Sequence, residues 1–308
     1  MRATLIAMHG SLDATMAEKP ALQPKAAIGP ALRAIALHTL AGARAALSDP
    51  ERSFPDAVHD FRRAMKEWRA LMRLLAPFIV DAERWRTEAR DYARSLAHAR
   101  DGQAALNALD DLLKKGMVLS ERSTATVRGR IEALRGSEER ALTPELRDAI
   151  VGWLDAASAS VELWPLDPFD FAAIAGQLAL GYRNARRHLP ADWSLATPEA
   201  LHALRRRVVD HRYQMELIEP LWPRFGRMWT EEAERLRDRL GKCQDLAVLE
   251  RLTGPHQPLA HWRSRLTPAC TERRVQLSHR AGRIARRLFA ERPKAFRRRL
   301  ETLWEHGR

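Results

Sequence analysis

The chain has 308 residues, of which 45% are hydrophobic and 30% charged, a globular composition that excludes a disordered protein. Lys and Arg outnumber Asp and Glu by 52 to 39, which gives a net charge of +13 and a pI near 10.6. This charge favours an anionic partner without deciding among nucleic acid, membrane and inorganic polyanion. With only Cys243 and Cys270, a disulfide framework is not expected and a reducing, cytoplasmic compartment is.

The N-terminal segment comes first in chain order. Its one apolar run, residues 5–8, is too short for the core of a signal peptide, and no later stretch is long enough for a membrane span. We expect residues 1–25 to form a mobile tail, and we expect no membrane partner.

Nearly all later residues follow helical periodicity, and strand patterns are missing. The sequence predicts an all-α protein, with about six helices before a break at residues 163–171 and about six after it. Thr143-Pro144 and Thr197-Pro198 predict helix starts with a threonine N-cap and proline at the first helical position. Gly116 predicts a helix end.

One predicted helix, over residues 57–75, carries a basic stripe beside its apolar stripe. The basic stripe consists of His59, Arg62, Lys66, Arg69 and Arg73. At 100° per residue it occupies an arc of roughly 80°, next to an apolar arc of about 100°. Asp60 and Glu67 fall on the opposite face, where solvent is expected. Cations at the border of a core point into a groove between helices, where an anion would relieve their mutual repulsion. The alternative is that these long side chains extend from the border into water.

The same pattern recurs later in the chain. Residues 57–75 align without gaps to residues 200–218, with His, Arg and Arg at matched offsets and Val209 in the place of Lys66. Trp85 matches Trp229, and residues 96–101 match residues 240–245. A repeat of about 140 residues predicts duplication of one helical bundle, not a short-period solenoid.

The first copy carries His59, Arg62, Lys66 and Arg69, and the second carries His202, Arg205 and Arg212 at the same offsets. In these residues the chain resembles the CHAD family, the conserved histidine α-helical domain, over about residues 28–305. The second copy departs from the family pattern at Val209 and at Gln244. The resemblance implies two pseudo-twofold-related four-helix bundles, residues 26–165 and 166–308, that line a basic central groove. It also implies non-catalytic binding of inorganic polyphosphate and association with polyphosphate granules. The Glu-x-Glu-x-Lys signature of the triphosphatase-type domain often fused to the family is absent from the sequence.

The candidate polyphosphate-binding residues are the cations of the two stripes and of a third series with similar spacing near the C-terminus. They are His59, Arg62, Lys66, Arg69, Arg73, His202, Arg205, Arg206, Arg212, Arg273, Arg280, Arg283 and Arg287. The third series has a competing interpretation as a solvated basic helix. We expect each stripe histidine to lie in the first turn of its helix, where the macrodipole favours a neutral imidazole.

Two other classes of function stay open from the residues alone. Nucleic-acid binding needs exposed aromatic rings for stacking, but Trp68 lies on the apolar face and no DNA-binding motif is evident. An enzyme would use the stripe histidines with Asp101 and Asp245, yet no phosphate loop, nucleophile elbow or metal-ligand spacing accompanies them. We expect these aspartates to cap helices or to pair with the stripe. No catalytic residue, metal or cofactor is expected, and nothing fixes the oligomeric state.

Overall fold

The computed structural model describes residues 19–96, 100–138 and 143–307, and all regular structure within these ranges is helical. The eleven α-helices are α1 (Ile28–Ser48), α2 (Phe54–Leu75), α3 (Ala82–Ser95), α4 (Arg100–Lys114), α5 (Glu121–Glu138), α6 (Pro144–Glu162), α7 (Phe171–Arg187), α8 (Pro198–Leu217), α9 (Pro223–Arg251), α10 (Arg263–Leu288) and α11 (Pro293–His306), with short 3-10 helices at Glu219–Leu221 and Ala260–Trp262. No helix in the described ranges is long and apolar enough to cross a membrane. The all-α prediction is therefore confirmed.

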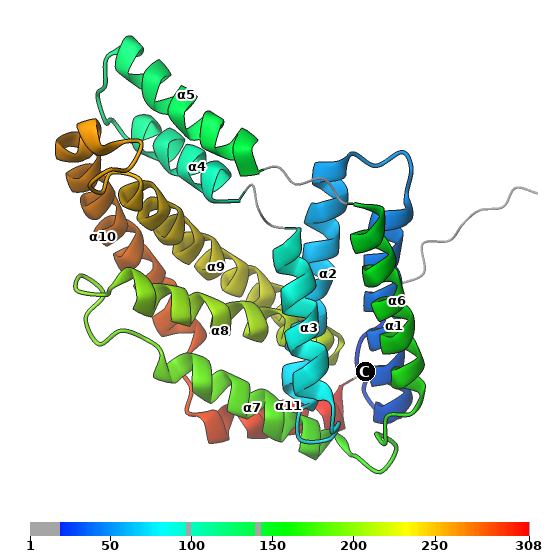
Figure 1. Cartoon of the computed structure of the whole chain (residues 1–308). Coiled ribbons are helices and arrows are strands. Elements are labelled where there is room, and N and C mark those ends of the chain that lie inside the picture. The colour runs from blue at the N-terminus through cyan, green and yellow to red at the C-terminus, as the bar shows by residue number, and fades with distance from the viewer. Residues whose placement is uncertain (1–18, 97–99, 139–142, 308) are drawn as a thin grey trace, which may run out of the picture.

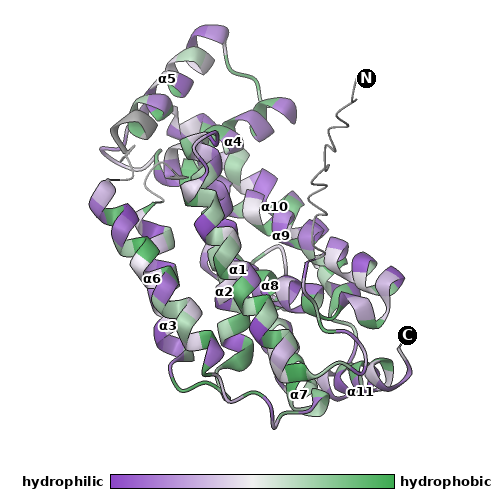
Figure 2. Ribbon diagram, turned by 90° about the vertical axis from the view of Figure 1, so that its right-hand side faces the viewer, coloured by the Kyte–Doolittle hydropathy of each residue, from purple (hydrophilic) through white to green (hydrophobic). Residues whose placement is uncertain are grey.

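The predicted helix boundaries follow from local chemistry. The hydroxyls of Thr143 and Thr197 accept the backbone N–H of Leu146 and Ala200, which caps α6 and α8 as expected. Gly116 lies two residues beyond α4 with a φ of +96°, a conformation that glycine adopts without strain. Hydrophilic and hydrophobic residues alternate along the helices in Figure 2, as amphipathic helices require.

A first group of four helices, α1, α2, α3 and α6, stands upright side by side in Figure 1. Its centre is aromatic: the ring of Trp68 on α2 meets Trp153 on α6 edge-on at 6.3 Å, and Trp153 also meets Trp85 on α3 at 6.0 Å. Trp68 is fully buried. The expectation that this tryptophan belongs to the core is confirmed.

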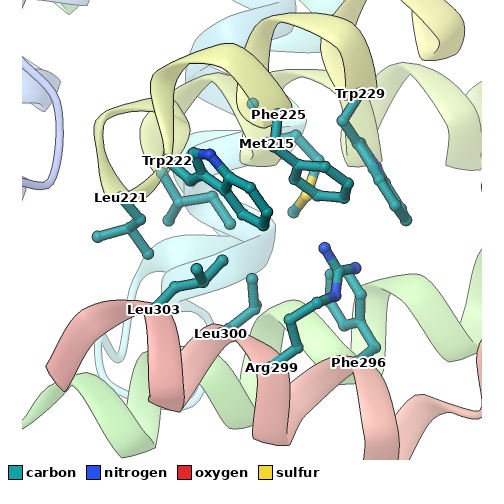
Figure 3. A pocket seen from close by; sticks show the side chains of 11 residues that line it. Met215, Leu221, Trp222, Phe225, Trp229, Phe296, Arg299, Leu300 and Leu303 are labelled. Carbon is teal, nitrogen blue, oxygen red and sulfur yellow. The ribbon is translucent and has the colours of Figure 1, made fainter. Parts of the chain in front are cut away.

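A second group is formed by α7, α8, α11 and the first part of α9. Here Tyr182 stacks on Phe296 at 4.3 Å, and the indole N–H of Trp229 donates to Nε2 of the buried His211 at 2.9 Å. Figure 3 shows Arg299 and Phe296 rising from α11 toward Trp229 and Phe225 on α9. The Arg299 guanidinium lies 4.8 Å from the centre of the Trp229 ring. The hollow drawn there is lined mostly by apolar residues, with Arg299 among them.

A third group joins the two chain halves. Helix α4 precedes residue 165 but packs against α9 and also contacts α10, and α5 packs on α4. Arg273 of α10 donates from Nε to Oδ2 of Asp111 on α4 at 2.7 Å, and from Nη2 to Oδ1 at 3.3 Å. The predicted division into bundles 26–165 and 166–308, and the internal duplication, stay predictions.

Three local expectations need correction. Of the two roles expected for Asp245, helix capping is wrong, because α9 runs without interruption from Pro223 to Arg251; pairing with the stripe stays a prediction. His59 and His202 do not lie in first turns: α2 begins five residues before His59, and α8 begins four before His202. The tail expected to end at residue 25 is packed from residue 19 onward, since Leu22 is fully buried and its N–H donates to the Leu217 carbonyl. Residues 1–18 lie outside the described residues.

The buried His211 predicts a pH dependence of folding. Burial, and to a smaller degree the charge of Arg299, lowers the pKa of His211 from 6.5 to about 3. In the unfolded chain the His211 imidazole binds a proton as the pH falls through 6.5, whereas in the folded protein it stays neutral down to about pH 3. The free energy of unfolding is therefore independent of this group above pH 6.5 and decreases between pH 6.5 and pH 3. We expect the free energy of unfolding to fall by about 1.4 kcal/mol for each pH unit in this window.

Urea unfolding between pH 7.5 and 5 checks this. His211→Phe should flatten the slope even though Trp229 loses its acceptor, whereas the same change at the exposed His279 should keep it. An unaltered slope in His211→Phe would contradict the assignment.

The ion pair between α4 and α10 predicts a loss of stability without it. Burial alone raises the pKa of Asp111, but the hydrogen bonds and charges of Arg273 and Lys242 hold it below its ordinary value. Arg273→Met would leave this carboxylate, only 13% exposed, with Lys242 alone, and should cost about 3 kcal/mol of unfolding free energy. The double variant with Asp111→Asn should lose less than the sum of the single changes; additive losses would show that the pair is not coupled.

Candidate anion-binding site

Helix α2 presents the two stripes as the sequence predicts. Its apolar residues Phe61, Met65, Trp68 and Met72 are buried, while the cations from Arg62 to Arg73 along the border are half-buried, apart from the exposed Arg63. His59, one position earlier in the series, is exposed. The half-buried arginines and Lys66 therefore lie where their charges are only partly hydrated.

The opposite face of α2 departs from expectation. Glu67 does not face open solvent, because Lys19 lies across it with Nζ 3.2 Å from the Glu67 carboxylate and 3.6 Å from that of Glu216 on α8. Asp60 is likewise only part-exposed and pairs with Arg52 at 2.7 Å. The described part of the N-terminal segment thus covers a place where α2 and α8 each offer a carboxylate.

Where α2 packs against α8, Asp210 is inserted among arginines. Its Oδ2 lies 2.8 Å from Nε of Arg73, and its side chain is only 14% exposed. Burial raises the pKa of Asp210, and the charges of Arg73, Arg69 and Arg207 oppose that rise. Burial also lowers the pKa of Arg69 and of Arg73, an effect that Asp210 opposes. These charges are partly removed from water, and a charge removed from water costs free energy unless an opposite charge compensates it.

Two further arginines, on α3, lie within electrostatic reach of this place because α3 packs against α2. Arg86 lowers the pKa values of Arg69 and Arg73 through its charge, and Arg90 lowers that of Arg69. Arg86 also binds Glu83, with Nε donating at 2.8 Å, and Arg90 donates to Asp91 at 2.9 Å. We name the five guanidinium groups the arginine cluster: Arg69, Arg73, Arg86, Arg90 and Arg207.

In the second stripe, unlike in the arginine cluster, Arg212 has more acidic than basic neighbours. Arg212, which aligns with Arg69, lies between two carboxylates, with Nη2 2.6 Å from Glu216 and Nε 2.7 Å from Glu234. Its guanidinium also covers the ring of Tyr213 at 4.7 Å. Glu216 aligns with Arg73, so an acid stands where the first stripe has a cation. Arg212 is thus compensated within the protein.

Arg205 lies at a separate hollow of about 450 Å³ between α4, α8 and α9. Arg237, Arg239 and Lys242 of α9 share its wall, together with Asp238 and Asp245. Arg206, next to Arg205, is exposed, while His202 and Val209 are half-buried. Val209 is not one of the buried core residues, so the second stripe is interrupted at an accessible position.

The third series does not join the arginine cluster. Arg273 is buried in the ion pair with Asp111, and we leave it out of the proposed site because its guanidinium ties α10 to α4. Arg280 and Arg283 are exposed on α10, and Arg287 pairs with Glu232 at 3.0 Å. Helix α10 packs on α9 and α4, one helix away from α8.

Sequence reasoning therefore found Arg69 and Arg73 but missed Arg86, Arg90, Arg207 and Asp210. A signal for two of these existed in the repeat. With Trp85 aligned to Trp229, Arg86 falls on Thr230 and Arg90 falls on Glu234. These two cations are present in the first copy and absent from the second, so the comparison of the copies singles them out.

Comparison with known proteins agrees with this fold. A family model of the CHAD domain matches residues 26–254. The crystal structure of the CHAD domain from the plant Ricinus communis is similar with a TM-score of 0.57 at 18% identity, over 92% of this chain and 95% of that one. No curated protein matches the chain. At this identity the structural likeness shows the fold alone, but the family match spans well over half of the residues, and the chain belongs to the CHAD family.

Proposed function

We propose that the protein binds inorganic polyphosphate, without chemistry on it, through the arginine cluster. The observation that carries this proposal is the charge balance where α2 packs against α3 and α8: five guanidinium groups, whose charges influence the pKa values of Arg69, Arg73 or Asp210, stand against the three carboxylates of Asp210, Glu83 and Asp91. An excess of positive charge held partly out of water is stabilised by an anion. Membership of the CHAD family supports the same ligand class.

The chemistry of the cluster suits phosphate. A guanidinium group presents a planar fork of donors that matches phosphate oxygens, and it keeps its charge at any physiological pH. Several forks close together would bind consecutive phosphates of one chain, with affinity that falls steeply as salt rises. Recruitment to cytoplasmic polyphosphate granules is part of this proposal.

Nucleic acid is the less favoured ligand because of the rings beside the cluster. Binding of single strands relies on bases stacking on exposed aromatic side chains. Trp68 and Trp85, on the two helices that supply four of the five arginines, are buried. The cluster thus offers charge for a backbone without a stacking surface.

The first test removes charge from the cluster where folding is least at risk. Arg86→Gln with Arg90→Gln breaks pairs only with Glu83 and Asp91, which are 70% and 55% exposed. We expect binding of long-chain polyphosphate to weaken about tenfold, from two partly exposed charge contacts. By analogy with single strands, the slope of log affinity against log salt should shrink by roughly 1.5. Isothermal titration calorimetry at two salt concentrations measures both.

The matched control is Arg297→Gln with Arg298→Gln on α11, which lowers the net charge equally at exposed positions. It should change affinity less than twofold. Equal weakening in the two double variants would mean that net charge, and not the cluster, binds the ligand.

The second test concerns the ligand class. Because the cluster offers forks for phosphate without stacking rings, unlabelled polyphosphate should displace labelled polyphosphate at much lower phosphate concentration than duplex DNA or single-stranded RNA. Fluorescence anisotropy at physiological salt gives this ranking. Nucleic acid that competes equally well would overturn the choice of polyphosphate.

A further inference from the structure

Asp210 is an unusual neighbour for a site that binds anions. A carboxylate competes with phosphate for the same guanidinium donors, and this one lies in the middle of the arginine cluster, 2.8 Å from Nε of Arg73. The other two carboxylates of the cluster are mostly exposed, and each has an adjacent arginine on its own helix. Only Asp210 projects from α8 toward α2 and is largely buried there.

We propose that Asp210 is a resident counter-ion that occupies the position of a phosphate group in the unliganded protein and releases Arg73 when a polyphosphate binds. This inference rests on the proposed function and adds to it a residue that sets the affinity. It needs no covalent step, because only the partner of the Arg73 guanidinium changes.

The charges around Asp210 support an exchange of this kind. One carboxylate serves Arg73, Arg69 and Arg207, so it compensates the three cations incompletely. Burial of the carboxylate opposes its ionised form, so this compensation is itself costly. A phosphate chain carries about one charge per unit and more acceptor oxygens, so it engages several guanidinium groups at once.

Access to the pair is also present. The Arg73 side chain is 33% exposed although its partner is nearly covered, so a ligand can reach the guanidinium from the solvent side. Glu83 and Arg86 on α3, and Arg207 on α8, are near enough for their charges to influence the pKa of Arg73. A phosphate group that took the place of the Asp210 carboxylate would be subject to the same charges.

Because Asp210 competes for Arg73, the site discriminates among anions by the number of charges they carry. A single inorganic phosphate exchanges one anion for another and gains little, whereas a chain that also reaches Arg86 and Arg90 gains contacts that Asp210 never made. The site would therefore favour chains of three or more phosphates over inorganic phosphate.

Asp210→Asn tests the inference. Removing the competing charge should tighten binding of tripolyphosphate three- to tenfold and lower the melting temperature of the unliganded protein, since the arginines lose their counter-ion. The probes are inorganic phosphate, tripolyphosphate and long-chain polyphosphate, measured by calorimetry and by ligand-induced melting shifts. The gain should also appear with inorganic phosphate, which wild type binds weakly.

Glu216→Gln is the matched control. It removes one carboxylate from the same helix at a similar exposure, 20% against 14%, but Glu216 faces Arg212 and Lys19 instead of the cluster. Its affinity should stay within twofold of wild type. An equal gain in both variants would reduce the effect to net charge and overturn the inference, as would unchanged or weaker binding in a folded Asp210→Asn protein.

If Asp210→Asn does not fold, Asp210→Gln gives the same comparison, because its longer amide still offers Arg73 an acceptor. Asp210→Glu, which keeps the carboxylate, should retain wild-type affinity; tighter binding there would also overturn the inference. Failure of wild type to bind any of the three probes would instead overturn the proposed function.

Discussion

The repulsion among half-buried arginines is the constraint around which this molecule is arranged. Helix α2 packs against both α3 and α8, the charges of arginines on all three helices influence one another, and burial makes the charges of Arg69 and Arg73 harder to keep. A protein selected only for stability would replace such residues by apolar ones, because buried ion pairs add little to stability. Five arginines held together by Asp210 and two exposed acids therefore point to a binding role for the excess charge.

The second stripe shows the same helical arrangement at a place where Arg212 has no excess of positive charge around it. Arg212 is flanked by Glu216 and Glu234, and Glu216 is bridged through Lys19 to Glu67. These carboxylates compensate the cations. The Arg212 site is charge-compensated and the arginine cluster is not, which favours the cluster over the Arg212 site for anion binding.

Helical periodicity was sufficient to predict the all-α class, the caps at Thr143 and Thr197 and the burial of Trp68, because each depends on neighbours within one helix turn. The continuity of α9 was not predictable, since Asp245 was a candidate cap for a new helix, while the packing of α4, α8 and α10 around α9 keeps the helix intact. Arg69 and Arg73 were found by spacing alone. Asp210 and Arg207 required knowledge of which side of α8 meets α2, and Arg273 could not be separated from the other arginines until its contact with Asp111 was known.

The unbroken α9 has a mechanical consequence. A helix of 29 residues is a rod about 43 Å long at 1.5 Å per residue. Its first part packs with α8 and the Trp229 centre, and its last part packs with α4 and α10. The distance between those two regions is therefore fixed by the length of α9. Any change in the angle between them must occur where other helices pack against α9, through side-chain contacts such as the one between Lys242 and Asp111, and not by bending of the α9 backbone.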